Sequence, residues 1–504
     1  LLSRDRLRRI LPAAAALLFL AGALYRFDPK LSMNGDDAEF LILGRSIAAG
    51  EGMTNINEAH PTPHTKYPFL FPAFLALLER AAPGSILLPK SAGVLLGTAA
   101  AFLFAGLLLR VASPGLAAAG SLLYATNPFF LDFGQLILSE TPFLFSTLLA
   151  LVLYLRWEER GARSFPAGAA AAALAAYFTR TAGIALIGAL FVALLSRRRA
   201  RPALLLLLIA AAAATPWVIR NQRAGGGSAY MNQFFVKDPY NPGAGALDPA
   251  HFLTKRLAGN LETYGAYEIG RGIVPAPFAG RPGRGGGSAR ALAVIVSLAA
   301  AGGLVSRWRR SAGLLEIYAA FYLAVCLAWP EVWGSIRFLL PVLPLLLFYA
   351  LATGERLLGA LPAPAGRPAA AAALLLLLGS NVYANAKERP LAEYPPAWRN
   401  YEACALWARE NTPETSVFVS RKPGLFYVWS GRRSVAYLWS EDREALFSKM
   451  IEDGADYVVV APLSATTPRY LIPAINEHRD RFEALLHLPE PDTYVLRLLP
   501  EAAR

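Results

Sequence analysis

Apolar residues in this chain form long runs that short polar segments separate, which is the pattern of a protein that crosses a membrane several times. Runs of roughly 18 or more apolar residues are long enough to span the hydrocarbon core as helices. The pattern predicts about eleven crossings. They are expected at residues ~10–25, ~85–109, ~116–131, ~138–156, ~166–178, ~182–195, ~202–218, ~289–306, ~312–329, ~336–353 and ~368–384.

Arginine clusters occupy nearly every second connection between these runs, which is typical of cytoplasmic loops. The first cluster, residues 4–9, precedes the first run, so we expect a cytoplasmic N-terminus and a retained signal anchor. Two long connections, residues 26–83 and 220–288, then fall on the outer side. The second is rich in Gly, Pro and Tyr and is longer than a plain connection requires.

The first outer connection contains two helical patterns, at residues ~37–49 and ~68–81. In the first, Phe40, Leu43, Gly44 and Ile47 recur at the spacing of one helix face. We expect this helix to lie along the membrane surface and to end at the glycines that follow it.

Residues 386–504 differ in composition from the rest of the chain. Short β patterns alternate there with helical patterns, which favours a small α/β domain. The β patterns are Ser416–Ser420, Val435–Leu438, Tyr457–Ala461 and Tyr494–Leu499, and the helical ones are ~398–410, ~441–453 and ~468–484. The sequence therefore predicts a polytopic α-helical membrane domain, residues 1–385, with outer loops 26–83 and 220–288. A soluble periplasmic or extracellular α/β domain, residues 386–504, follows it.

Composition and the absence of certain motifs argue against several classes of function. The chain is 55% hydrophobic and 17% charged, and its net charge is +13. The positive excess lies in the membrane part, because residues 387–504 hold slightly more acidic than basic residues, so no nucleic-acid partner is implied. Two cysteines imply no disulfide framework. The absence of a phosphate-binding glycine loop argues against an ATP-driven pump and against a nucleotide-sugar donor.

An acidic cluster, Asp36, Asp37 and Glu39, follows the first apolar run, and a lone carboxylate, Glu140, begins another run on the same side. Carboxylates at a membrane rim are costly, so they indicate function. Transfer of a group to a hydroxyl or amine needs a general base, and Asp36 or Asp37 can supply it. The alternative is local: Asp36 caps a helix and Glu39 completes a capping box.

Cations on the same side can receive a departing phosphate. They are Lys66, Arg180 and Arg337. Alternatively, the two arginines extend to the interface and Lys66 is a solvated loop residue. His60 and His64 have metal-like spacing, but the prolines between them exclude a helix, so polar loop residues are the simpler interpretation. No protein metal site is assigned, and a divalent metal is kept only as a candidate cofactor.

Several stretches together resemble the GT-C superfamily, the polyprenyl-phosphate-sugar-dependent glycosyltransferases that include protein O-mannosyltransferases and the lipid A aminoarabinose transferase. In the first outer loop they are Asp36-Asp37-Ala38-Glu39-Phe40, Gly50-Glu51-Gly52 and Lys66-Tyr67-Pro68-Phe69-Leu70-Phe71-Pro72. Later ones are Ser139-Glu140-Thr141-Pro142-Phe143, Thr179-Arg180, Pro216-Trp217-x-x-Arg220-Asn221 and Arg337-Phe338-x-x-Pro341. Asp37 stands where the family has Glu, and Tyr67 stands within the family's Lys-Pro-Pro.

The resemblance implies a multi-pass enzyme of the bacterial inner membrane that moves a hexose or pentose from a polyprenyl-phosphate donor to a glycan, lipid or protein acceptor. Asp36 maps to the base, with Asp37 beside it, and Glu140 to a further catalytic carboxylate. The donor phosphate maps to Lys66, Arg180 and Arg337. The acceptor or sugar groove is assigned to Glu39, Tyr67, Arg220 and Tyr264. The main alternatives are a transporter or flippase of lipid-linked sugars and a non-catalytic assembly protein.

Overall fold

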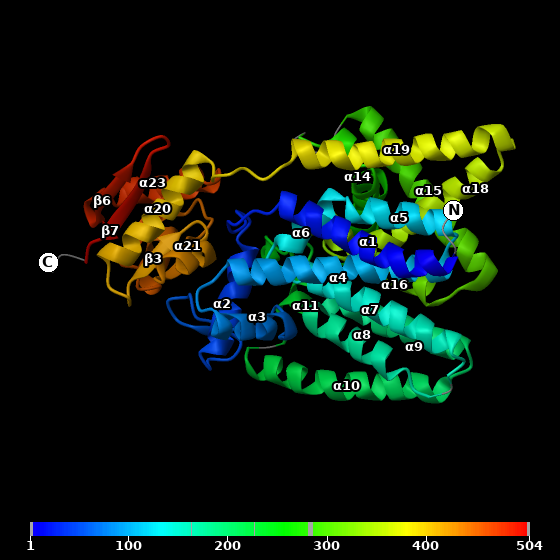
Figure 1. The fold of residues 1–504 in the computed structure, drawn as a ribbon. Coiled ribbons are helices and arrows are strands. Elements are labelled where there is room, and N and C mark those ends of the chain that lie inside the picture. Colours follow the sequence, from blue (N-terminus) through cyan, green and yellow to red (C-terminus); the bar gives the residue numbers. More distant parts are fainter. Residues whose placement is uncertain (1–3, 163, 226, 281–285, 501–504) are drawn as a thin grey trace. The chain divides into compact units, whose positions relative to one another are not determined.

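The computed structural model describes residues 4–162, 164–225, 227–280 and 286–500, and these residues form two compact units (Figure 1). The helical unit consists of the chain up to Phe27 together with residues 65–71 and 90–390. The mixed unit consists of residues 28–64, 72–89 and 391 onward. The first outer connection is thus shared: its acidic part belongs to the unit that contains the C-terminal residues, and Lys66 belongs to the helices.

The helical unit is built from long apolar helices with shorter helices between them. The long helices are α1 (Arg4–Tyr25), α4 (Leu87–Val111), α10 (Ala200–Arg223), α15 (Gly287–Ser311) and α19 (Ala363–Lys387). The others are α5 (Pro114–Ala125), α6 (Pro128–Gln135), α7 (Glu140–Glu159), α8 (Ala167–Thr179), η1 (Thr181–Gly183), α9 (Ile184–Ser196), α16 (Leu314–Ala328), η6 (Glu331–Trp333), α17 (Ile336–Leu339) and α18 (Leu343–Gly359).

Five of these helices are long and apolar enough to cross a membrane, and the bent pair α6–α7 makes a sixth if it is one span. Three shorter apolar helices lie at residues 167–179, 181–196 and 314–328. The chain is therefore a multi-pass membrane protein by the length and composition of its helices. The expected number of eleven crossings is not confirmed.

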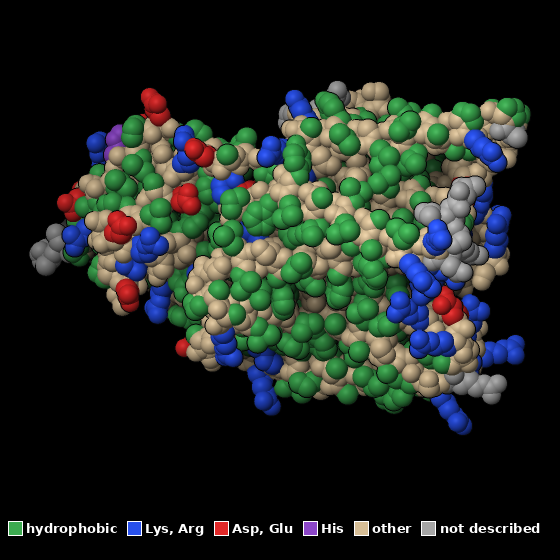
Figure 2. All heavy atoms as spheres, in the orientation of Figure 1, with side chains coloured by type: hydrophobic (Ala, Val, Ile, Leu, Met, Phe, Trp, Pro, Cys, Tyr) green, Lys and Arg blue, Asp and Glu red, His purple; other side chains and the backbone are tan. Residues whose placement is uncertain are grey.

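The helices of this unit share one hydrophobic core. Helix α7 packs on α8, α9 on both α10 and α16, and α15 on α18. Figure 2 shows hydrophobic side chains along the sides of these helices and Lys and Arg side chains gathered at the end where α9 meets α10 and α18 meets α19. Arg197, Arg198 and Arg356 belong to these turns. The arginine-rich connections of the sequence thus lie at one end of the folded helical unit.

A partly buried ion pair joins the C-terminal ends of α1 and α19 to α6. The Arg26 guanidinium donates to both carboxylate oxygens of Asp132, at 2.7 and 2.8 Å. It also donates to the carbonyl oxygens of Asn385 and Glu388, at 2.8 and 2.9 Å. Arg26 is 2% exposed, so its charge depends on these four contacts.

Two of the expected crossings are broken in the structure. Residues ~116–131 divide into α5 and α6, because Asn127 caps a new helix that starts at Pro128. Residues ~336–353 divide into α17 and α18, and Pro341, which has no backbone N–H, lies between them. The bend between α6 and α7 is 113°. The break between α5 and α6 and the break between α17 and α18 both place polar side chains at helix ends.

The long connection at residues 220–288 is mostly helical, where the sequence predicted a loop. Its helices are α11 (Ala229–Phe234), η2 (Pro242–Ala244), α12 (Pro249–His251), η3 (Phe252–Leu257), α13 (Ala258–Thr263), η4 (Tyr264–Glu268), α14 (Ile269–Ile273) and η5 (Ala276–Phe278). From Pro249 to Ile273 the helix is continuous, and η3 and η4 are π-helical turns within it. The glycines of this segment favoured the prediction of a loop. Gly270 and Gly272 are buried, and a Cβ at Gly270 would lie 2.2 Å from Ala293, so glycine permits close helix packing there.

The mixed unit holds a five-stranded sheet in the order β4-β3-β5-β7-β6. Strand β3 is parallel to β4 and β5, and β7 is antiparallel to β5 and β6. The strands are β3 (Val417–Ser420), β4 (Arg433–Ala436), β5 (Tyr457–Val460), β6 (Phe482–Leu488) and β7 (Thr493–Leu498). The helices are α20 (Pro396–Asn411), α21 (Pro423–Ser430), α22 (Arg443–Glu452), η7 (Thr467–Leu471), α23 (Ile472–Glu477) and η8 (Arg479–Arg481).

Successive residues of the central strands face opposite layers of this sheet. Phe418 joins a core with α20 and α21, and Val419 joins a core with α22 and α23. Strands β3, β5 and β7 lie where the sequence pattern places them. Strand β6 and helix α21 were missed, and the helical pattern expected to residue 484 ends at Glu477.

The mixed unit also contains α2 (Asp36–Ala48), α3 (Leu70–Ala81) from its third residue, and the hairpin β1 (Thr54–Asn55) and β2 (Thr62–Pro63). Helix α2 has the expected position but more than one buried face, because Leu41 and Ile42 are buried as well as Phe40 and Leu43. It packs against α21 within this unit, and its expected position along the membrane surface stays a prediction.

Candidate functional site

The break between α6 and α7 brings Glu140 to the start of a helix inside the helical unit. Glu140 is the first residue of α7 and is 1% exposed. A carboxylate in the first turn interacts favourably with the positive end of the helix. Burial of a single carboxylate would still be costly, so its partners decide its role.

Two arginines from distant segments bind the same oxygen of Glu140. Arg180 reaches Oε1 at 2.6 Å and also donates to the Ser139 hydroxyl at 3.1 Å. Arg337 forms a second ion pair and hydrogen bond with Oε1. Arg180 lies in extended backbone between α8 and η1, and Arg337 lies on the short helix α17. Three helix ends therefore meet at one carboxylate.

This cluster, the Glu140 triad, carries one net positive charge because two guanidinium groups share one carboxylate. The side chains of Arg180 and Arg337 are 14% and 25% exposed. Both arginines are therefore engaged by a carboxylate inside the helical unit, and whether they also reach the membrane interface stays a prediction. A partly buried cluster with excess positive charge is suited to an anionic ligand.

Lys66 belongs to the same unit and lies among aromatic rings. Its ammonium is 4.9 Å from the ring centroid of Tyr67 and 5.9 Å from that of Tyr230. The two rings are 6.1 Å apart in an edge-to-face arrangement. Tyr230 also interacts electrostatically with Arg180. Aromatic faces stabilise the lysine charge by cation–π attraction and leave it partly exposed.

The other predicted groove residues of the helical unit occupy different environments. The Arg220 guanidinium lies 5.2 Å from the ring of Trp217, which packs on Phe69 in the segment that also carries Lys66. Tyr67 and Tyr264 are 5% and 3% exposed. Tyr264 lies in the hydrophobic core of the unit. Its role in a groove stays a prediction.

The acidic cluster lies at the start of α2 in the mixed unit. Asp36, Asp37 and Glu39 all fall in the first turn of this helix, where they suit its dipole. The N-cap is Gly35, with φ 88°, so the interpretation of Asp36 as the cap of a capping box is wrong. Asp37 is fully buried, Asp36 is partly exposed and Glu39 is exposed.

Lys422 is a neighbour of this cluster that the sequence did not reveal. Its ammonium donates to the Asn34 carbonyl oxygen at 2.7 Å, and it interacts electrostatically with Asp36 and Glu39. Burial and the adjacent Arg421 lower the pKa of Lys422, while the two carboxylates oppose that shift. The only signal available was a basic pair, Arg421-Lys422, before the proline that starts α21.

Comparison with solved structures gives the fold. ArnT from Cupriavidus metallidurans, in its crystal structure bound to undecaprenyl phosphate, superposes with a TM-score of 0.58, 11% identity and 97% coverage of both chains. The Archaeoglobus fulgidus oligosaccharyltransferase gives a TM-score of 0.59 with 13% identity over 90% of this chain and 69% of its own. The chain has the fold of GT-C glycosyltransferases. No protein-family model matches the sequence, and no curated protein matches it.

Within this GT-C fold, the predicted site residues form two groups. Glu140, Arg180 and Arg337 meet in the helical unit, where Lys66 is linked to them through Tyr230. Asp36, Asp37 and Glu39 meet in the mixed unit. Whether the two groups form one site stays a prediction, as do their roles.

No group of three or more His, Cys, Asp or Glu side chains suited to a metal occurs among the residues that the structure describes. The two histidines with metal-like spacing differ in environment: His64 is buried and bonds through Nδ1 to Asn55 Oδ1 at 2.8 Å, and His60 is exposed. A divalent metal as cofactor stays a prediction.

Proposed function

We propose that this protein is an inverting membrane glycosyltransferase that moves a sugar from a polyprenyl-phosphate donor to an acceptor outside the cytoplasm. The observation that carries the proposal is the Glu140 triad, a partly buried cluster with excess positive charge, in a chain with the GT-C fold. The similar ArnT structure contains bound undecaprenyl phosphate, which supports a lipid-phosphate donor here.

The positive charges of the Glu140 triad and Lys66 match the charge of the leaving phosphate better than the charge of the donor phosphate. The donor is a phosphodiester with one negative charge, and the product is a monoester with nearly two at neutral pH. The Glu140 triad supplies one net positive charge and Lys66 supplies another. Because the second charge develops only as the sugar leaves, these cations stabilise the transition state more than the bound donor.

The proposed chemistry is one displacement. Asp36 or Asp37 accepts the proton of the acceptor hydroxyl or amine, and the acceptor oxygen or nitrogen attacks the anomeric carbon. The bond from that carbon to the phosphate oxygen breaks, and its electron pair stays on the phosphate. The anomeric configuration inverts, and no covalent enzyme intermediate forms. Asp36 is the better candidate base, because Asp37 is fully buried.

Glu140 is proposed as a positioning residue. Its Oε1 is occupied by Arg180 and Arg337, so it holds both guanidinium groups at one point. A carboxylate engaged in this way is a poor base for an acceptor. The sequence assigned it a catalytic role, and the geometry favours an indirect one.

The proposal also includes the orientation of the protein in the membrane. The arginine-rich end of the helical unit faces the cytoplasm of a bacterial inner membrane, and the C-terminal residues form a periplasmic or extracellular domain. The three shorter apolar helices, together with α5 and α18, are proposed to bring the number of crossings to about eleven. The sugar is a hexose or pentose, and the acceptor is a glycan, lipid or protein.

The decisive test uses the purified protein in nanodiscs. Undecaprenyl-phosphate hexose and pentose donors labelled in the sugar are added with a cell-envelope extract as acceptor, and transfer of label and release of undecaprenyl phosphate are measured. Arg180→Gln and Arg337→Gln are expected to reduce transfer about 10- to 100-fold, because each removes a charge-assisted hydrogen-bonding partner of the phosphate.

Asp36→Asn separates the base from the binding groups: it should abolish transfer and leave undecaprenyl phosphate binding unchanged. The matched control is Glu262→Gln, which removes an exposed carboxylate paired with Arg290 in the helical unit. Unchanged transfer in both Asp36→Asn and Asp37→Asn removes the enzyme proposal. Movement of intact donor across vesicle membranes without transfer would favour the flippase instead.

A further inference from the structure

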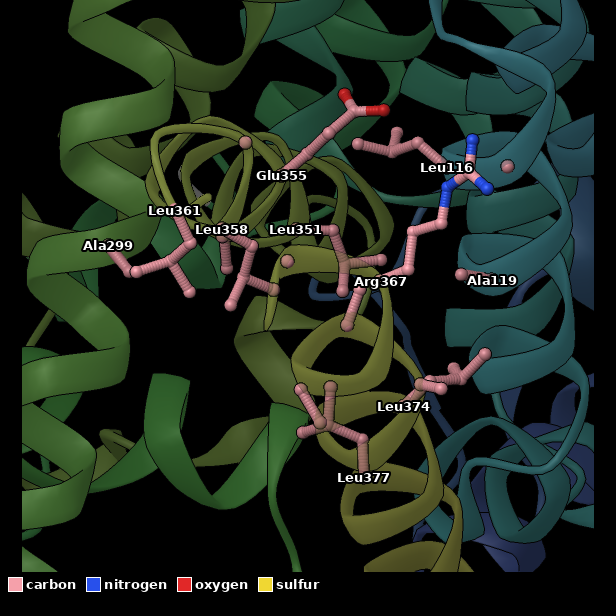
Figure 3. A pocket seen from close by; sticks show the side chains of 18 of the residues that line it. Leu116, Ala119, Ala299, Leu351, Glu355, Leu358, Leu361, Arg367, Leu374 and Leu377 are labelled. Carbon is pink, nitrogen blue, oxygen red and sulfur yellow. The ribbon is translucent and has the colours of Figure 1, made fainter. Parts of the chain in front are cut away.

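A cavity of about 860 Å³ lies in the helical unit (Figure 3). It is enclosed by α5, the end of α14, α15, α18 and α19. Its size falls within the range of small-molecule pockets, which is roughly 300–1,000 Å³. None of the candidate site residues lines it.

The lining is apolar except at one edge. Among the described residues that line it, Glu355 on α18 and Arg367 on α19 are the charged ones. Figure 3 shows their charged groups at the same edge, and Leu374 and Leu377 at the opposite end of the cavity. Glu355 also accepts a hydrogen bond from the Ser113 hydroxyl. The cavity is therefore amphipathic along its length.

The cavity contains open space beside small residues. A Cβ built at Gly115, Gly354 or Gly359 would meet no atom within 4 Å. Helix α19 forms one wall, and only 17% of its apolar window is buried within the protein. In a membrane this helix faces lipid, so lipid has direct access to the cavity.

We propose that this space, the α18–α19 cavity, binds a phospholipid whose headgroup carries both a phosphate and a primary ammonium group. Arg367 binds the phosphate, Glu355 accepts a hydrogen bond from the ammonium, and an acyl chain lies along Leu374 and Leu377. The headgroup has one charge of each sign, and so has the edge of the cavity.

Charge complementarity selects this class over other lipids. An anionic glycerol headgroup satisfies Arg367 but meets the carboxylate of Glu355 without a cation. A choline headgroup has the right charges, but its quaternary nitrogen has no N–H to donate to Glu355. Glu355 and Arg367 lie on either side of the turn between α18 and α19, at the end of the helices where Lys and Arg side chains gather (Figure 2), so the lipid belongs to the leaflet on that side.

The test is native mass spectrometry of the full chain. The protein is equilibrated with equal amounts of phosphatidylethanolamine, phosphatidylglycerol and phosphatidylcholine and then released from detergent. Wild type is expected to retain phosphatidylethanolamine about tenfold over the other two, because one charge-assisted hydrogen bond distinguishes them. Arg367→Gln should weaken all three lipids, since all contain phosphate. Glu355→Gln should remove only the preference for phosphatidylethanolamine over the other two lipids.

Two controls address indirect effects. Leu374→Trp fills the cavity and should displace the lipid, whereas Leu376→Trp, on the same helix at a side chain that is 75% exposed, should not. Ser113→Ala removes the hydrogen bond to Glu355 without removing the carboxylate, so the headgroup preference should persist.

Retention of the three lipids in proportion to their abundance, or equal retention in Leu374→Trp, would show only annular lipid and overturn the proposal. Displacement of phosphatidylethanolamine by undecaprenyl phosphate at stoichiometric concentration would also overturn it, because the cavity would then belong to the donor. Loss of sugar transfer in other variants has no bearing on these outcomes.

Discussion

Replacement of Glu140 by Gln tests the Glu140 triad most directly. The change removes a negative charge that is 1% exposed and leaves the guanidinium groups of Arg180 and Arg337 next to each other. Removal of one partner from a buried ion cluster costs roughly 3–5 kcal/mol, because the remaining charges stay buried without compensation. The amide oxygen still accepts a hydrogen bond, so we expect the lower end of this range.

The two cysteines of the chain provide the assay. Cys326 is 4% exposed in the helical unit and Cys404 is fully buried in the mixed unit. In a Cys404→Ala background, the reaction of Cys326 with a fluorogenic thiol reagent during heating reports unfolding of the helical unit. A loss of about 3 kcal/mol at roughly 2 °C per kcal/mol for a large domain predicts a midpoint lower by about 6 °C.

The control is Glu262→Gln, whose ion pair with Arg290 is about half exposed on both sides. Such pairs contribute less than about 1 kcal/mol, so its midpoint should change little. Addition of Arg337→Gln to Glu140→Gln should recover part of the lost stability by removing one of the opposed charges. An unchanged midpoint in Glu140→Gln would refute the reasoning, because the triad would then carry no net interaction.

Three further predictions concern other contacts. Because the pKa of Lys422 is lowered in the folded chain, the unfolded chain binds that proton more tightly. Stability should therefore rise as pH increases toward the ordinary lysine value of about 10.5, and Lys422→Met should flatten this rise in urea unfolding followed by tryptophan fluorescence. Gly35→Ala places a side chain at φ 88° and should destabilise the mixed unit by about 1–2 kcal/mol, measured by Cys404 reactivity, whereas Gly35→Asn should cost less. Arg26→Met leaves Asp132 without its cation and should lower the Cys326 midpoint by more than Glu262→Gln does, and an equal midpoint would contradict the four contacts seen for Arg26.

Hydrophobic periodicity locates helices well in this chain, because burial and lipid contact both follow it. Residues ~85–109 and ~166–178 are close to the observed helices α4 and α8. Periodicity fails where backbone chemistry interrupts an apolar run. Pro341 divides one expected crossing, and Pro128 begins a new helix within another. In the region of residues 220–288, glycines used for close packing look the same in sequence as glycines used for turns.

The candidate site was partly visible in the sequence. Charges beside apolar runs directed attention to Glu140, Arg180 and Arg337, but their shared oxygen atom depends on tertiary structure. The pattern Asp36-x-x-Glu39 imitates a capping box, although the preceding glycine provides the cap. Asp132 is a lone carboxylate in an apolar stretch, and this pattern could have indicated the partly buried pair that it forms with Arg26.

The π-helical turns η3 and η4 affect how the sequence of this region can change. Each wide turn holds one residue more than an α-helix would need, so residues beyond it are rotated by about 100° relative to an uninterrupted helix. Deletion of one residue within either turn can therefore be absorbed locally as ordinary α-helix, and every later side chain up to Ile273 keeps its direction. Alignments of related chains should accordingly show single-residue gaps here, with the inward and outward positions that follow unchanged.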